Sequence, residues 1–275
     1  MTQDKAPRRV TPIGWTALGL AGAAMSAAVA AEAGSPAPFP AAPAEKIWLA
    51  QSTEGGEGGE SGHVADGDET VELLADLGLI EGHLRAGTAL YRAGLADQAA
   101  THMKHPQDEI YEELGGHLEE VGAKGFAEEL TSLAGAVAEK APVETVEAAL
   151  ANVLTAIAAA REAAGATESA EARAMVAILR TAADEYGIGV KDGAIAELHE
   201  YQDAWGFVET VRTQAEHMAG EEDAAEKAFG SAALAALDEA AEALPGVDPA
   251  GKTLGDPAAL LAAVAKVELA AYKLR

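Results

Sequence analysis

The sequence predicts an all-α protein, an antiparallel helical bundle built from two similar halves. Alanine, glutamate and leucine are the most frequent helix-forming residues, and aromatic residues make up only 4%. This composition favours helices and lacks the β-branched and aromatic clusters typical of strands. Apolar residues recur at three- and four-residue spacing, and no segment shows the alternation of a half-buried strand. Glycine and proline interrupt the pattern often, which predicts short turns between neighbouring antiparallel helices.

The first 33 residues have the organisation of a secretory signal. Lys5, Arg8 and Arg9 precede an uncharged stretch, Trp15–Ala30, and small residues follow. This is the order of a basic, an apolar and a cleavage region. The stretch is shorter than the roughly 20 apolar residues needed to span a bilayer. We therefore predict a signal peptide over residues 1–33 and a soluble periplasmic protein with no stable membrane insertion after cleavage; an uncleaved anchor is the alternative.

Residues 34–67 differ sharply in composition from the rest of the chain. They contain "GSPAPFPAAPAEK" and "STEGGEGGESG". Segments so rich in proline, glycine and glutamate cannot bury a core. We predict a disordered tether here.

Signals for the starts and ends of helices recur from residue 68 onward. An apolar stripe predicts a first helix that ends at Gly94. A second helix should stop near His105, because Pro106 disfavours helical geometry in the preceding residue and suits the first turn of the next helix. Glycines near 115 and 122 are expected to break the chain again. The stripe consists of Leu73, Leu77, Ile80, Leu84 and Tyr91, and further helices are predicted at 126–139, 142–164, 168–186, 193–218, 221–243 and 256–273.

The chain resembles itself at an offset of 95 residues. The shift lays "YRAGLADQAATHMKHPQDEI" over "YGIGVKDGAIAELHEYQDAW" without a gap. A duplication would give a first helical half at 68–164 and a second at 165–275, and a chance match between alanine-rich segments is the alternative. Under the duplication, His102 and His105 correspond to Glu197 and Glu200.

These paired positions are the first candidate metal site. His102 and His105 have the three-residue spacing that places two donors on one helix face, and Glu109 lies one turn further on. His83, beside the apolar stripe of the preceding helix, could face the same corner. Imidazole with carboxylate suits iron, zinc or copper. The alternative is structural, with His105 capping a helix and His102 pairing with nearby acids.

A second polar cluster lies in "ELHEYQDAWGFVE". It contains Glu197, His199, Glu200 and Asp203 within two turns, and His199 and Asp203 are four residues apart. The interleaved aromatic residues, Tyr201, Trp205 and Phe207, are typical of core contacts. For this cluster we prefer the structural interpretation, and keep only Glu197 and Glu200 as ligand candidates.

Charge and composition exclude several classes of function. The formal net charge of −26 argues against binding to phosphate backbones and is compatible with attracting cations. The absence of cysteine excludes thiolate metal sites, iron–sulfur clusters and cysteine nucleophiles. No nucleophile–base motif is present, so we do not expect an enzyme.

A third candidate is "GGHLEE". Gly115-x-His117-x-x-Glu120 resembles the Gly-x-His-x-x-Glu motif of the imelysin-like periplasmic proteins of bacterial iron uptake. The resemblance implies a secreted all-helical protein, often with two bundles, in which His117 and Glu120 would be metal ligands. It spans six residues, and the mature chain is short for the two-bundle form.

Together these features predict an exported protein that binds a transition-metal cation. Iron is the first choice, followed by copper or zinc, and the protein would buffer the cation or deliver it to another envelope or transport protein. The alternative function is a non-enzymatic helical adaptor that binds another envelope protein.

Overall fold

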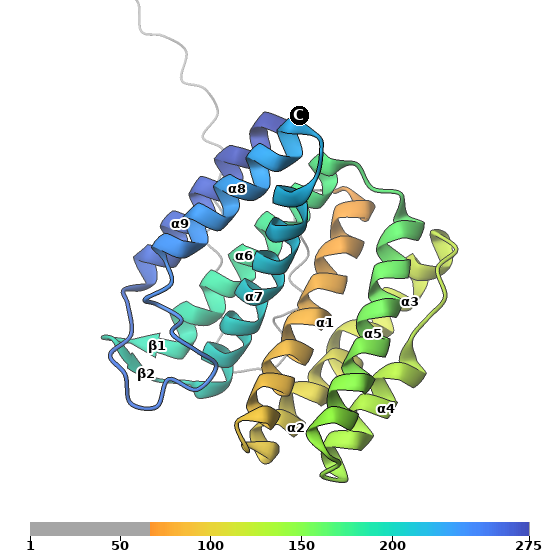
Figure 1. The fold of residues 1–275 in the computed structure, drawn as a ribbon, viewed down its shortest axis with the longest axis vertical. Helices are drawn as coiled ribbons and strands as arrows, with labels where there is room; N and C mark the ends of the chain where they lie inside the picture. Colours follow the sequence, from red (N-terminus) through yellow and green to blue (C-terminus); the bar gives the residue numbers. More distant parts are fainter. Residues whose placement is uncertain (1–66, 275) are drawn as a thin grey trace, which may run out of the picture. The chain divides into compact units, whose positions relative to one another are not determined.

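The computed structural model describes residues 67–274, apart from the side chains of Asp108 and Glu109. Helices account for nearly all of this part, so the predicted all-α class is confirmed (Figure 1). The predicted signal peptide and almost all of the predicted tether lie outside the described residues.

Helix α1 (Glu69–Arg92) runs through the middle of the fold (Figure 1). It begins where the Asp68 side chain accepts a hydrogen bond from the backbone N–H of Thr70, at 3.1 Å. Four of the five residues of the predicted apolar stripe are buried and Tyr91 is half-buried, but residues on other faces of α1 are buried as well, among them Leu74 and Leu79. A helix buried on more than one face needs neighbours on each of them, and α1 packs against α2, α5, α6 and α7.

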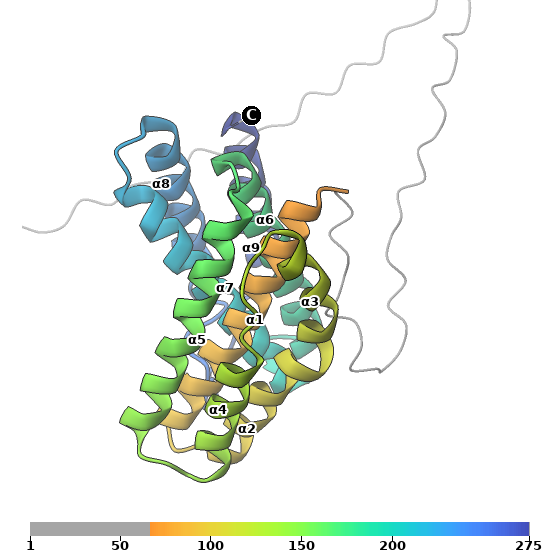
Figure 2. The same cartoon turned by 90° about the vertical axis from the view of Figure 1, so that its right-hand side faces the viewer.

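The first half of the described chain forms a ring of four helices. The members after α1 are α2 (Ala96–His105), α4 (Ala127–Ala138) and α5 (Val143–Ala164). Helix α1 packs on α2, α2 on α4, α4 on α5, and α5 returns to α1. Helix α3 (Tyr111–Glu120) lies at the side of this ring, against α1 (Figure 2). We name this group the first ring.

The second half forms another ring, which we name the second ring. Its members are α6 (Glu168–Gly189), α7 (Leu198–Gly220), α8 (Ala224–Glu239) and α9 (Pro257–Ala271). Each packs on the next, and α9 returns to α6. The two rings meet where α1 packs on α6 and α7 (Figure 1). The boundary between α1 and α7 is the part of the fold that positions the candidate site.

Two glycines allow α1 and α7 to approach closely. A Cβ atom added to Gly206 would overlap the backbone carbonyl of Gly82, and one added to Gly82 would overlap the Phe207 ring. Only residues without a side chain fit such a crossing. His83 follows Gly82 directly, and Asp203 lies one turn before Gly206, so the crossing brings these two side chains to the same place.

The chain between α2 and α3 corrects two predictions. Helix α2 does end at His105, but the backbone continues helically through a π-helical turn, η1 (Pro106–Ile110). Proline has no N–H to donate, and a π turn accommodates the irregularity. The predicted break at Gly115 and Gly116 is wrong, because α3 runs through both residues. The helix ends before Gly122, whose φ is +70°.

A small hairpin corrects the predicted helix 193–218. Strands β1 (Val190–Lys191) and β2 (Ala194–Ile195) pair antiparallel, and α7 starts only at Leu198. Asp192 and Gly193 both have positive φ, 53° and 74°, as a type I′ turn requires. Residues 191–197 therefore differ in secondary structure from the helical residues 96–102 at the 95-residue offset. The proposed duplication stays a prediction.

Candidate metal centre

Three fully buried residues from three helices converge at the junction of the rings. Asp203 Oδ1 on α7 lies 2.7 Å from His83 Nδ1 on α1 and 2.8 Å from His102 Nδ1 on α2. One donor atom from each residue lies within 4.8 Å of the other two. Two imidazoles and a carboxylate at this separation can hold one cation, because their donor atoms already converge.

Two further histidines extend this group toward solvent. His199 Nδ1 on α7 lies 3.3 Å from His102 Nε2 and 3.5 Å from Asp203 Oδ2. His199 Nε2 lies 3.3 Å from Nε2 of His105, the last residue of α2. We name these five residues, His83, His102, His105, His199 and Asp203, the junction cluster.

The four imidazoles lie at the corners of a quadrilateral. Its sides are the distances between ring centroids: 6.5 Å from His83 to His102, 4.2 Å from His102 to His199, 4.5 Å from His199 to His105, and 5.8 Å from His105 back to His83. Asp203 contacts three of the four histidines. The arrangement therefore concentrates nitrogen donors around one carboxylate.

Helical periodicity places these side chains. His102 and His105 are three residues apart on α2, and His199 and Asp203 are four apart on α7, so each pair lies on one helix face. Close packing of α2 on α1 completes the site: a Cβ atom on Gly87 would lie 3.3 Å from the Cβ atom of His102. The glycines of α1 thus admit both α7 and α2 beside His83.

The Asp203 carboxylate is held in its charged form. Burial alone would raise its pKa, but the charge of His83 and hydrogen bonds with His102 and His83 outweigh burial and hold the pKa well below its usual range. For His199, burial is the largest influence and lowers the pKa, although the Asp203 charge opposes it. His199 is consequently neutral at pH 7, as metal coordination by imidazole requires.

His102 has an acceptor oxygen beside each ring nitrogen. Asp203 Oδ1 lies 2.8 Å from Nδ1 and Gln202 Oε1 lies 3.0 Å from Nε2, while Gln202 Nε2 donates to Gln98 Oε1 at 2.7 Å. A cation shared with Asp203 would take the place of a proton on Nδ1, and Nε2–H would then donate to Gln202 Oε1, a hydrogen bond that orients the metal-bound imidazole. Asp203 Oδ2 is buried and has no hydrogen-bond partner among the described residues. A cation beside it would satisfy this oxygen.

The structure brings some of the predicted ligands together and separates others. His83, His102 and His105 meet, as the sequence suggested. Their partners on α7 are His199 and Asp203, for which the sequence pattern favoured a structural role. The four-residue spacing of His199 and Asp203 was a visible signal for a shared site, but the aromatic residues between them favoured the core interpretation.

Glu197 and Glu200 do not take the positions that the 95-residue offset suggested. Glu197 is the exposed N-cap residue of α7. Glu200 is half-buried, and its charge only partly offsets the larger effect of burial, which lowers the pKa of His199. The Glu109 side chain lies outside the described part of the structure.

His117 and Glu120 lie on α3, and Glu120 is exposed. Within residues 67–274, no contact of either residue with the junction cluster is found. The imelysin-like motif therefore marks a different place from the site that the structure assembles.

Comparison with known families connects the chain with iron. Residues 162–274 match the iron permease-associated 4-helix bundle domain. The match covers less than half of the 275 residues and corresponds to the second ring with the end of α5. No curated protein and no solved structure matches the chain. The match associates the chain with iron uptake and transport rather than with enzymes, and it does not support the imelysin-like family.

The predicted periplasmic location is wrong. The matched domain is associated with an iron permease, which is an integral membrane transporter. Among the described helices, α5 is long and apolar enough to cross a membrane by length and composition, with a mean hydropathy of 1.4. Only 22% of that apolar window is buried within the described structure.

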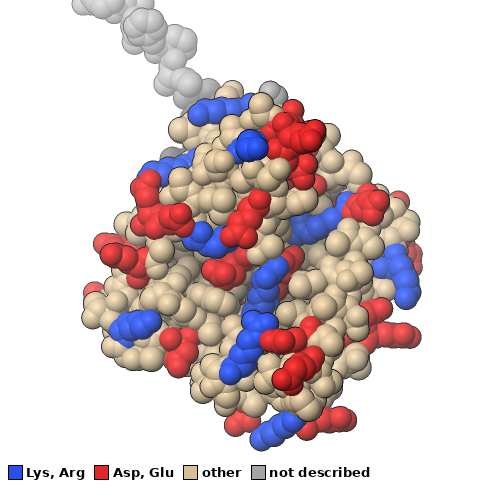
Figure 3. Space-filling model, in the orientation of Figure 1, with Lys and Arg blue, Asp and Glu red and all other residues tan. Residues whose placement is uncertain are grey.

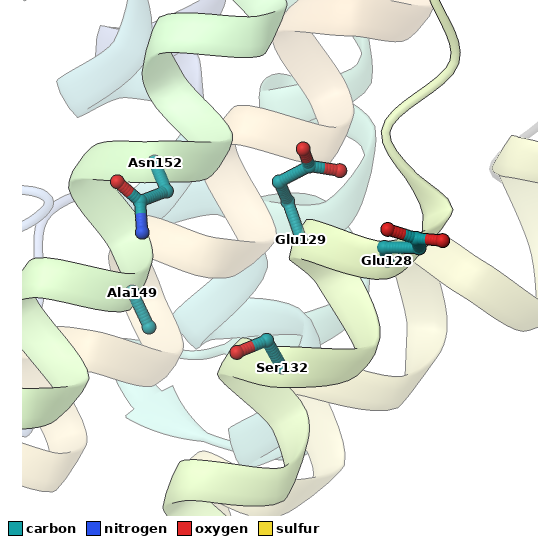
Figure 4. A pocket seen from close by; sticks show the side chains of 5 residues that line it. All are labelled: Glu128, Glu129, Ser132, Ala149 and Asn152. Atoms are coloured by element: carbon teal, nitrogen blue, oxygen red, sulfur yellow. The ribbon is translucent and has the colours of Figure 1, made fainter.

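Two surface features are less suited to a cation than the junction cluster. Figure 3 shows acidic and basic side chains interspersed over the viewed face, with broad uncharged areas between them. A pocket of about 150 Å³ lies between α4 and α5 (Figure 4). Its charged residues are the exposed Glu128 and the half-buried Glu129, and Lys124 lies 4.0 Å from Glu129. Solvated carboxylates of this kind are common without a ligand.

Proposed function

We propose that the junction cluster binds a transition-metal cation as cargo for an iron permease-related transport system. One observation carries the proposal: two buried imidazoles and a buried carboxylate from three helices converge within 4.8 Å. Burying a carboxylate is costly unless it is paired, so such a group favours a positively charged partner. The family match of the second ring supports iron as that partner.

The donor set favours ferrous iron over ferric iron. Four of the five residues in the junction cluster offer imidazole nitrogen, a donor that suits divalent iron, zinc, copper and nickel. Hard cations such as calcium and magnesium prefer sites made of oxygen donors only, so they fit this cluster poorly. We therefore propose Fe²⁺ as the first choice, with Zn²⁺ and Cu²⁺ as competitors.

The cluster is suited to reversible binding. Imidazole must be neutral to coordinate, so affinity falls as pH decreases through the range in which histidine takes up protons. His199 retains 29% side-chain exposure, so the cluster is in contact with solvent at one end. These properties fit a carrier that loads and releases a cation. We propose a membrane transport protein as the partner that receives it.

The convergence of the histidines also separates this proposal from the helical adaptor. Histidines dispersed over separate faces would have favoured a purely structural bundle that presents a binding surface. Instead, four of them meet in one place across the junction of the two rings.

Anaerobic calorimetric titration of the full chain with Fe²⁺, repeated with Zn²⁺, tests the proposal. We expect His102→Ala to weaken binding by about 100-fold, since it removes a first-choice ligand and a partner of Asp203. The matched control is His217→Ala, because His217 is 79% exposed on α7 and pairs with Glu221. Equal binding by the wild type and His102→Ala would remove the junction cluster from consideration.

A further inference from the structure

We propose that the junction cluster holds a second, outer cation position between His105 and His199, through which the cation reaches the buried inner position. The inference rests on the proposed function and adds a second binding position on the path of the cation from solvent to the buried residues. The inner position would use the three buried residues, His83, His102 and Asp203, and the outer position would use two residues nearer to solvent.

The spacing of the outer pair matches coordination of one ion. The Nε2 atoms of His105 and His199 are 3.3 Å apart. Two imidazole nitrogens bound to one tetrahedral ion at about 2.0–2.1 Å lie about 3.3–3.4 Å from each other. The imidazole planes of His105 and His199 are almost perpendicular, at 87°, and their centroids are 4.5 Å apart. Small ring rotations are therefore sufficient to direct both lone pairs at an ion.

His199 faces both positions. Its Nδ1 lies 3.3 Å from His102 Nε2, and its Nε2 lies 3.3 Å from His105 Nε2. A neutral imidazole has one lone pair, so His199 can bind an ion at one position at a time. A change of tautomer would move that lone pair from the outer side of the ring to the inner side. His199 is thus placed to pass an ion from one position to the other.

Exposure increases along the same path. The side chains of His83 and Asp203 are 0% exposed and that of His102 is 1% exposed, while His199 reaches 29%. His105, at the end of α2, is half-buried. An ion arriving from solvent therefore meets His105 and His199 before it meets the buried carboxylate.

The chemistry of the outer pair defines its ligand. Two imidazoles suit a divalent cation of intermediate softness, such as Fe²⁺, Zn²⁺ or Co²⁺, with water completing the coordination. Glu200 contributes a negative charge near His199, which favours a cation there. With only two protein donors, the outer position should be weaker and exchange faster than the inner one.

Titration of the full chain with Co²⁺, followed by its visible absorption and by metal content after equilibrium dialysis, tests the inference. We expect the wild type to bind two ions, one tightly and one about 10- to 100-fold more weakly. His105→Ala should bind one ion instead of two and should load it about 5- to 10-fold more slowly in stopped-flow mixing, because the outer position is lost. His217→Ala should behave as the wild type.

The outcomes separate the two proposals. One ion per wild-type chain, with His105→Ala loading at the wild-type rate, would overturn the outer position and leave the proposed function intact; the His105–His199 contact would then be an ordinary hydrogen bond. No difference in Co²⁺ binding between wild type and His102→Ala would overturn the proposed function itself. Two ions in the wild type and one slowly loaded ion in His105→Ala support both.

Discussion

The two rings of helices have the same arrangement but contribute differently to the candidate site. Each ring closes four helices on one another, and the two meet along α1 and α7. The first ring supplies His83, His102 and His105, while the second supplies His199 and Asp203. Only the second ring lies within the segment that matches the iron permease-associated domain.

This difference shows that the site belongs to the junction and to neither ring alone. The matched segment carries the carboxylate and one imidazole, which are too few donors for a closed site. The three remaining imidazoles come from helices that lie outside the match. A change that separates the rings should therefore abolish metal binding, whereas a change within one ring and away from the junction cluster should leave it largely intact.

The largest effect is expected from Asp203→Ala. Removing this carboxylate deletes the contact shared by His83, His102 and His199 and leaves their polar atoms buried. We expect the free energy of unfolding to fall by about 3 kcal/mol and metal affinity to fall at least ~100-fold. Urea unfolding and calorimetric titration measure the two quantities. Wild-type affinity in this variant would show that Asp203 takes no part in binding.

The second-largest effect is expected at the close contact of α1 with α7 through Gly82 and Gly206. Gly206→Ala forces a methyl group onto the carbonyl of Gly82, so α1 and α7 must move apart. We expect a loss of about 2–3 kcal/mol in unfolding free energy together with weakened metal binding. Gly115→Ala is the matched control, since nothing lies within 4 Å of the added atom and the residue is inside a helix. That control should gain about 0.5–1 kcal/mol from helix propensity. Equal behaviour of the two variants would contradict a close crossing.

Acidification should destabilise the metal-free protein through the junction. In the unfolded chain His199 takes up a proton near pH 6.5, but its lowered pKa delays this in the folded chain, so protonation favours unfolding. Stability should fall between pH 7 and pH 5 by less than about 1.4 kcal/mol per pH unit from this residue. Asp203, whose pKa is lowered, adds a further loss below about pH 4. Denaturant unfolding at a series of pH values measures the loss of stability in both pH ranges, the upper window between pH 7 and pH 5 and the lower one below about pH 4.

His199→Gln provides the control for the upper window. The variant should lose part of the slope between pH 7 and pH 5 and keep the loss below pH 4. An unchanged slope would mean that another group is responsible for the upper window.

A change within the second ring should reduce stability without affecting the site. The Tyr186 hydroxyl donates to the backbone carbonyls of Gly255 and Ala243, at 2.9 and 3.1 Å, and ties α6 to the segment between α8 and α9. Burial raises the pKa of Tyr186 to about 12, so the hydroxyl stays protonated. Tyr186→Phe should lower the unfolding free energy by about 1 kcal/mol and change metal affinity less than ~3-fold. A large loss of affinity would show coupling between this loop and the junction.

The smallest effect is expected at the predicted imelysin-like motif. The double substitution His117→Ala, Glu120→Ala changes residues on α3 with no contact to the junction cluster among the described residues. Metal affinity should stay within ~2-fold of wild type by calorimetry, because no ligand is lost. A loss as large as that expected for His102→Ala would restore the motif as a metal site.

The sequence predicted the helices well because their signals are local. Apolar spacing, Pro106 and the glycines at 94 and 122 lie within one or two turns of the boundaries they set. The prediction failed at Gly115, where α3 stays helical. It also failed at Asp192–Gly193, where the two-residue sequence Asp-Gly was the only signal of the hairpin turn. Two of the five junction-cluster residues, His199 and Asp203, were missed because the α1–α7 crossing depends on Gly82 and Gly206, and their pairing across the chain leaves no local pattern.

Anomalous diffraction from crystals loaded with Zn²⁺ or Fe²⁺ tests the central claim most directly. The account predicts a metal peak at the junction of the rings, within about 2.0–2.2 Å of donor atoms from α1, α2 and α7. A peak confined to His117 and Glu120, to the pocket beside Glu128, or absent from the loaded protein would contradict it.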